Sequence, residues 1–94
     1  LLRGVPIKLA DGTTVRVRTI PFTDQGYAIA GMLDKLGEAG DTNIELLDAM
    51  LDICHAALRL NYPDMTRERL ASLLDIALAH RIIAALRGEV EDNL

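Results

Sequence analysis

The segment 43–60 constrains the fold most, because it has the pattern of a helix with two apolar faces. One stripe contains Ile44, Leu47, Leu51, Cys54 and Leu58, and a second contains Leu46, Met50, Ile53, Ala57 and Leu60. Each stripe steps by three or four residues, so each stays on one face of a helix. A helix on the surface of a globular protein has one apolar face. We therefore expect this helix to be buried on two sides, by its own domain, by a partner, or by both.

A β-hairpin is predicted over residues 5–20. Apolar and polar residues alternate on both sides of Asp11-Gly12, a pair that favours a tight turn because glycine tolerates positive φ. Pro6 has no amide hydrogen, which places the first strand at an edge, and Pro21 predicts the end of the second strand. A lone hairpin is marginal in water, so another element has to cover it.

A first helix is predicted over residues 23–36. Thr23 has the position of an N-cap, and Asp24 follows in the first turn. Phe22 and Tyr27 have the spacing of a hydrophobic staple, and Gly37 is the expected helix stop. The glycines inside the helix lower its intrinsic stability, but they also permit close packing.

The carboxy-terminal half predicts a helix break and two further helices. Pro63 disfavours helical geometry at the preceding residue. Helices are then expected over 67–74 and 77–87, or as one continuous helix, with an acidic tail over 89–94. The predicted fold is mainly α with a small amino-terminal β-hairpin, an α+β bundle of three to four helices. The length of 94 residues fits a single domain over 1–94.

Composition excludes several classes of function. A net charge of −4 and three aromatic residues argue against a nucleic-acid partner, because neither phosphate neutralisation nor base stacking is provided. The acidic composition also argues against an anionic-membrane partner, and no membrane span is expected because no run of about 18 apolar residues exists. Cys54 is the one cysteine, which excludes an internal disulfide and makes the cytoplasm the default compartment.

Candidate catalytic residues are few. His55 follows Asp52 by three residues, a spacing that can orient an imidazole for base catalysis or metal binding, but a solvated helix pair is the more common arrangement. Cys54 lies on an apolar stripe, where a thiol is more often a small buried hydrophobe than a nucleophile. The sequence has no clustered metal-ligand motif and no glycine-rich phosphate loop. We therefore expect a protein that is not an enzyme and that has no cofactor or metal.

The apolar excess of the helices predicts a protein-binding surface or an oligomer. The candidate partner-binding residues are Met50, Ile53, Ala57, Ile82, Ile83 and Leu86. The same residues can instead form a homo-oligomer interface, and an intramolecular core is an equally weighted alternative for any one of them.

Residues 56–66 read Ala-Ala-Leu-Arg-Leu-Asn-Tyr-Pro-Asp-Met-Thr and are followed by Leu70, Leu73, Leu74 and Asp75. This segment resembles the tail assembly chaperones of long-tailed bacteriophages and prophages. Residues 5–9 and 20–23 are also similar to the opening hairpin and first helix of that family. The chain departs from the family at Arg67 and Arg69, where acidic residues are usual, and at Leu60, where a polar residue is common.

The resemblance implies a role in assembly. Such chaperones bind the tape measure protein and keep it soluble while the tail tube forms. In many phages a frameshifted extension recruits the tail tube protein. The expected location is then the cytoplasm of the bacterial host, outside the mature virion. The alternative is a small helical protein-binding adaptor or regulatory module that forms a homo-oligomer.

Overall fold

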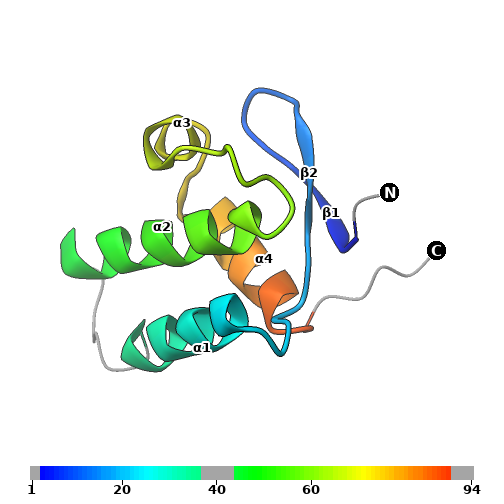
Figure 1. The fold of residues 1–94 in the computed structure, drawn as a ribbon. Coiled ribbons are helices and arrows are strands. Elements are labelled where there is room, and N and C mark those ends of the chain that lie inside the picture. The colour runs from blue at the N-terminus through cyan, green and yellow to red at the C-terminus, as the bar shows by residue number, and fades with distance from the viewer. Residues whose placement is uncertain (1–2, 37–43, 90–94) are drawn as a thin grey trace.

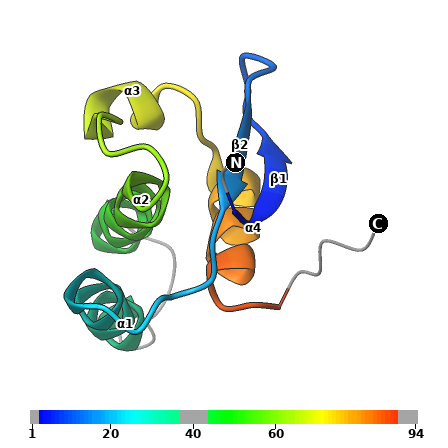
Figure 2. The same ribbon diagram turned by 45° about the vertical axis from the view of Figure 1, so that its right-hand side comes forward.

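The computed structural model describes residues 3–36 and 44–89. Along these residues the elements are β1 (Val5–Lys8), β2 (Thr14–Val17), α1 (Asp24–Leu36), α2 (Ile44–Arg59), α3 (Arg67–Ala71) and α4 (Ile76–Leu86). The predicted α+β class is confirmed. The helices α1, α2 and α3 form one layer, and α4 with the hairpin forms the other (Figures 1 and 2).

The hairpin buries one of its faces. Ile7 pairs with Val15 across the two antiparallel strands, and both side chains are buried together with Val17. The hairpin packs against α4, and β2 also contacts α2, which provides the cover that the sequence requires. The second strand ends at Val17 and not at Pro21 as predicted. Beyond it, the amide of Ile20 donates a hydrogen bond to the last residue of α4 (3.1 Å) and so leaves the strand register.

The predicted turn at Asp11-Gly12 is confirmed. Gly12 has a φ of +87°, which glycine adopts without strain. Oδ1 of Asp11 accepts a hydrogen bond from the amide of Thr13 at 2.9 Å. This bond stabilises the carboxylate and lowers the pKa of Asp11 below its ordinary value.

Two side chains from the segment just after α2 cover the open edge of β2. The hydroxyl of Tyr62 accepts a hydrogen bond from the amide of Arg16 at 3.0 Å. The side-chain amide of Asn61 donates to the carbonyl of Arg16 at 3.0 Å and to that of Arg3 at 2.7 Å. Backbone groups of a strand edge otherwise need another strand or water. Asn61 and Tyr62 therefore fasten the hairpin to the helical layer.

The first helix begins as predicted, but its hydrophobic staple is absent. The hydroxyl of Thr23 accepts a hydrogen bond from the amide of Gly26 at 3.2 Å, which confirms the N-cap. Phe22 is 95% exposed and Tyr27 is 68% exposed, so the predicted contact between them is wrong. A Cβ at Gly26 would overlap the carbonyl oxygen of Pro21, so this glycine serves a close backbone approach. The predicted stop at Gly37 lies outside the described residues.

The third helix is shorter than predicted, and the fourth is separate from it. The prediction of a helix over 67–74 is wrong at its end, because α3 stops at Ala71. Asp75 has extended backbone, and its Oδ1 accepts a hydrogen bond from the amide of Leu78 at 2.8 Å. This N-cap starts α4 one residue before the predicted range of 77–87 and excludes a continuous helix. Gly88, with a φ of +79°, follows the end of α4 as predicted.

The core forms around α2. This helix ends at Arg59, close to the predicted end, and packs against α1, α3 and α4 (Figure 1). In its carboxy-terminal half, both apolar stripes are buried by other parts of the same chain, as Ile53, Cys54, Ala57 and Leu58 show. The expected burial on two sides is therefore provided there by the domain itself. The amino-terminal half is different, because Ile44 and Leu47 are exposed.

Candidate protein-binding surface

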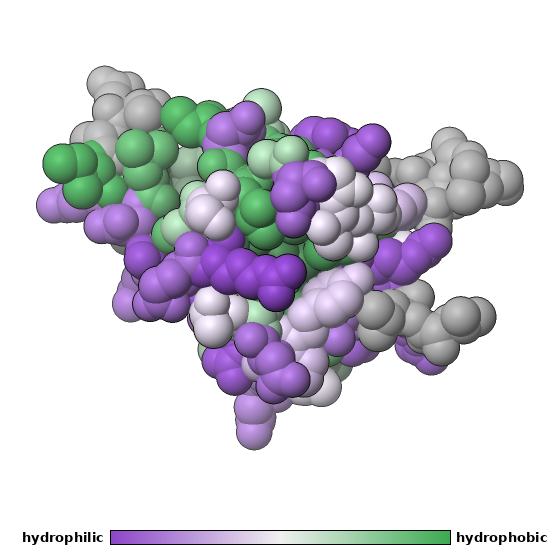
Figure 3. Space-filling view, turned by 90° about the horizontal axis from the view of Figure 1, so that it is seen from above, coloured by the Kyte–Doolittle hydropathy of each residue, from purple (hydrophilic) through white to green (hydrophobic). Residues whose placement is uncertain are grey.

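An apolar groove lies where the amino-terminal half of α2 meets the end of α3 and the start of α4. Its volume is about 190 Å³. The lining residues are Leu47, Met50, Leu51, Ala71, Leu74, Asp75, Ile76 and Ala79. The space-filling view shows hydrophobic side chains gathered toward the end of the molecule where α2 begins (Figure 3). We refer to these eight residues as the α2–α4 groove.

Large apolar side chains are exposed at the rim of the α2–α4 groove. Leu47 is 41% exposed and Ile76 is 46% exposed. Ile44, at 77%, lies one helical turn before Leu47 and extends the apolar surface toward the start of α2. Single exposed hydrophobic residues are ordinary on a protein surface, whereas a cluster around a depression is typical of a binding site.

The local sequence explains why the α2–α4 groove stays open. Ala71 ends α3, and Ala79 lies in the first turns of α4, so two of the facing positions carry only a methyl group. The non-helical residues 72–75 separate the two helices. The N-cap at Asp75 fixes the start of α4. The groove is therefore built from short side chains and a chain reversal.

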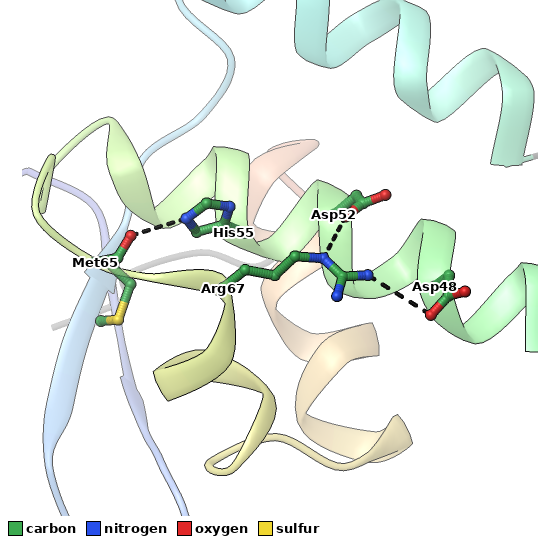
Figure 4. Close-up of polar contacts among 5 residues, drawn as sticks. All are labelled: Asp48, Asp52, His55, Met65 and Arg67. Carbon is green, nitrogen blue, oxygen red and sulfur yellow. Dashed lines mark hydrogen bonds and ion pairs between the residues drawn. The ribbon is translucent and has the colours of Figure 1, made fainter.

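Charged residues fasten α3 to α2 (Figure 4). Nε of Arg67 donates to Oδ1 of Asp52 at 2.7 Å, and Nη2 of Arg67 lies 3.6 Å from Oδ1 of Asp48. The hydrogen bond to Asp52 and the nearby negative charges raise the pKa of Arg67 above its ordinary value. Two carboxylates share one guanidinium here, which leaves one negative charge in excess.

The histidine of α2 has a structural partner. Nε2 of His55 lies 2.8 Å from the carbonyl oxygen of Met65 and donates to it in the tautomer that carries the hydrogen on Nε2 (Figure 4). The side chain of Asp52 bonds Arg67 and not His55, so neither the catalytic pair nor the solvated pair considered from the sequence is present. His55 instead holds the loop that precedes α3 against α2.

The cysteine is enclosed in the core. Sγ of Cys54 lies 3.7 Å from the carbonyl oxygen of Ala79. Burial disfavours the thiolate and raises the pKa of Cys54 to about 12. The side chain thus has the environment of a packed hydrophobe. Within residues 3–36 and 44–89, His, Cys, Asp and Glu side chains form no group of three or more that could hold a metal ion.

The six candidate partner-binding residues are core residues in the structure. Met50, Ile53, Ala57, Ile82, Ile83 and Leu86 are all buried. Packing of α2 against α4 and α1 encloses these side chains, so they do not form an exposed surface, and their burial agrees with the intramolecular alternative; partner binding by these residues stays a prediction. Met50 is the one member that also lines the α2–α4 groove, where it forms part of the floor.

The groove residues that the sequence did not single out belong to the first stripe of α2, to the end of α3 and the segment after it, and to the start of α4. Leu47 and Leu51 lie on that stripe, and Ile76 follows the N-cap at Asp75. The sequence did contain a signal for these residues. The first apolar stripe of α2 begins at Ile44, and a helix as short as α3 cannot cover the whole length of that stripe.

Comparisons of the chain with protein-family models, with curated proteins and with solved structures find no match. Among the described helices, none is both long enough and apolar enough to cross a membrane.

Proposed function

We propose that the chain is a non-enzymatic assembly chaperone of a phage or prophage tail, which binds the tape measure protein and keeps it soluble. The observation that carries the protein-binding part of this proposal is the α2–α4 groove with its exposed rim of Leu47, Ile76 and neighbouring Ile44. An apolar groove between helices is suited to the apolar face of a partner helix. The site of action is the cytoplasm of the bacterial host.

The resemblance of residues 56–66 to the tail assembly chaperones supports the identity of the partner. In this chain Asn61 and Tyr62 of that segment fasten the hairpin to α2. The segment therefore maintains the arrangement of hairpin and helices. In the proposed role, recognition is left to the exposed end of α2 and the start of α4.

The test is co-expression with the protein of the neighbouring very long tape measure gene. We expect the two chains to co-purify and the soluble fraction of the tape measure protein to increase. The control is co-expression with the same gene and an unrelated acidic helical protein of similar size. Absence of a complex together with unchanged solubility contradicts the proposal. A homo-oligomer that has no effect on the tape measure protein favours the adaptor alternative.

A further inference from the structure

We infer that the α2–α4 groove takes an amphipathic helix of another protein whose apolar stripe is flanked by lysine or arginine. This inference rests on the proposed protein-binding function and adds the chemistry of the partner and the residues that recognise it. It is carried by the volume of the groove, by the exposure of its rim and by the charges beside it.

The size of the groove favours side chains of a polypeptide. Its volume of about 190 Å³ is below the roughly 300–1,000 Å³ of small-molecule sites. A helix that lies along such a groove anchors a few apolar residues at i, i+3, i+4 and i+7. Leu47 of α2 and Ile76 of α4 both line the groove, so anchors seated in it contact α2 and α4 together.

The charges beside the groove select the flanks of the partner. Asp52 is engaged by Nε of Arg67 at 2.7 Å, whereas Asp48 lies at 3.6 Å from the same guanidinium and its side chain is 66% exposed. Asp75 is exposed and lines the groove from the α4 side. Asp48 is next to the lining residue Leu47 in α2 and is paired with Arg67, and Oδ1 of Asp75 caps α4. Each of these exposed carboxylates has a second oxygen that can accept from a cation of a partner. Complementary charges at an interface rim increase the association rate and set partner choice.

The same charges argue against a second copy as the occupant. Two copies that meet groove to groove would bring Asp48 and Asp75 of one chain toward the same carboxylates of the other. Like charges placed against each other at an interface disfavour association. Among the described residues, the large apolar side chains exposed at the rim are also few, namely Leu47, Ile76 and neighbouring Ile44. The groove therefore fits a partner of opposite charge and not a symmetric dimer.

The experiment uses the full chain and a labelled synthetic peptide of about 20 residues, long enough for helix formation. Its leucines follow the i, i+3, i+4, i+7 pattern, and the flanking positions carry lysine in one version and glutamate in the other. Binding is measured by fluorescence anisotropy. We expect the lysine peptide to bind about tenfold more tightly, and this preference to shrink in about 0.5 M salt.

Variants locate the binding. We expect Leu47→Ser to weaken binding of the lysine peptide by about tenfold, since it removes an anchor contact. Phe22→Ser is the matched control, because Phe22 is exposed but does not line the groove. Asp48→Asn is expected to reduce the preference for the lysine peptide. Asp34→Asn, with the same charge change on the exposed face of α1, is expected to leave that preference unchanged.

Four results would overturn the inference. Equal binding of the two peptides excludes the cationic flank, and an equal effect of Leu47→Ser and Phe22→Ser excludes the groove. A dimer in light scattering that dissociates on Leu47→Ser assigns the groove to a second copy. If the tape measure protein co-purifies equally with wild type and Leu47→Ser, the inference fails and the proposed function stands. If the lysine peptide binds through the groove but the tape measure protein does not co-purify, the proposed function fails alone.

Discussion

Substitution Tyr62→Phe tests whether the hairpin is held to the helical layer by side chains. The change removes one hydroxyl, which accepts a hydrogen bond from the amide of Arg16 at 3.0 Å across 46 positions of sequence. The ring stays, so its packing against the core is retained. The amide of Arg16 is part-buried and loses its phenol acceptor, which makes the loss larger than the deletion of a solvated bond.

The expected magnitude follows from the character of this bond. A neutral hydrogen bond contributes about 0.5–1.5 kcal/mol, and a part-buried donor that loses its acceptor is at the upper end of that range. We expect the free energy of unfolding to fall by about 1–1.5 kcal/mol. In a domain of this size this corresponds to a decrease in Tm of roughly 4–12 °C.

The assay is urea denaturation followed by far-ultraviolet circular dichroism, because the chain has no tryptophan. The slope of the transition should stay constant while the midpoint decreases. Tyr27→Phe is the matched control, since Tyr27 is 68% exposed on α1. A loss in Tyr62→Phe no larger than that in Tyr27→Phe would refute the role of the hydroxyl.

Three further predictions concern the backbone, the thiol and the turn. Gly26→Ala should lower the free energy of unfolding by more than ~1 kcal/mol, because the added Cβ overlaps the carbonyl of Pro21. Gly31→Ala places its Cβ in open space and should raise the free energy of unfolding by up to about 1 kcal/mol. Urea denaturation of the two variants distinguishes these outcomes. Cys54, with a pKa of about 12, should react with a thiol reagent at pH 8 far more slowly in the native protein than in urea, and equal rates would contradict its burial. Because the pKa of Asp11 is lowered in the folded protein, its carboxylate adds stability above the ordinary pKa, and this stability is lost as the pH falls through the lowered value. Asp11→Asn should remove this part of the acid dependence of stability. Denaturation measured across pH 2–6 checks this.

Local signals in the sequence were sufficient for most elements. The turn at Asp11-Gly12, the N-cap at Thr23 and the stop at Gly88 each depend on one residue and its backbone neighbours. The backbone geometry of these features is set by the residues themselves, so they can be predicted without knowledge of the fold. The two stripes of α2 likewise predicted a central helix, and the structure places it there.

Features that depend on distant contacts were not predictable in the same way. Asn61 and Tyr62 signal a helix break in the sequence, but their bonds to Arg16 arise only when the hairpin folds against the end of α2. The break between α3 and α4 is local, since Ser72 is the C-cap of α3 and Asp75 is the N-cap of α4, but the apolar pattern around these residues obscured it. Pattern alone also cannot divide apolar residues between core and surface, because both have the same spacing.

Some residues of α2 are needed for folding, and others are exposed and available to a partner. Met50 is 4% exposed, so Met50→Asp would bury a charge and unfold the domain, and any loss of partner binding would then report stability. Leu47 lies one turn earlier and is 41% exposed, so a polar substitution there removes surface with little loss of core packing. A variant that loses partner binding while its free energy of unfolding stays constant identifies a residue that contacts the partner. Because Met50 is part of both the core and the groove floor, only the rim positions provide that separation.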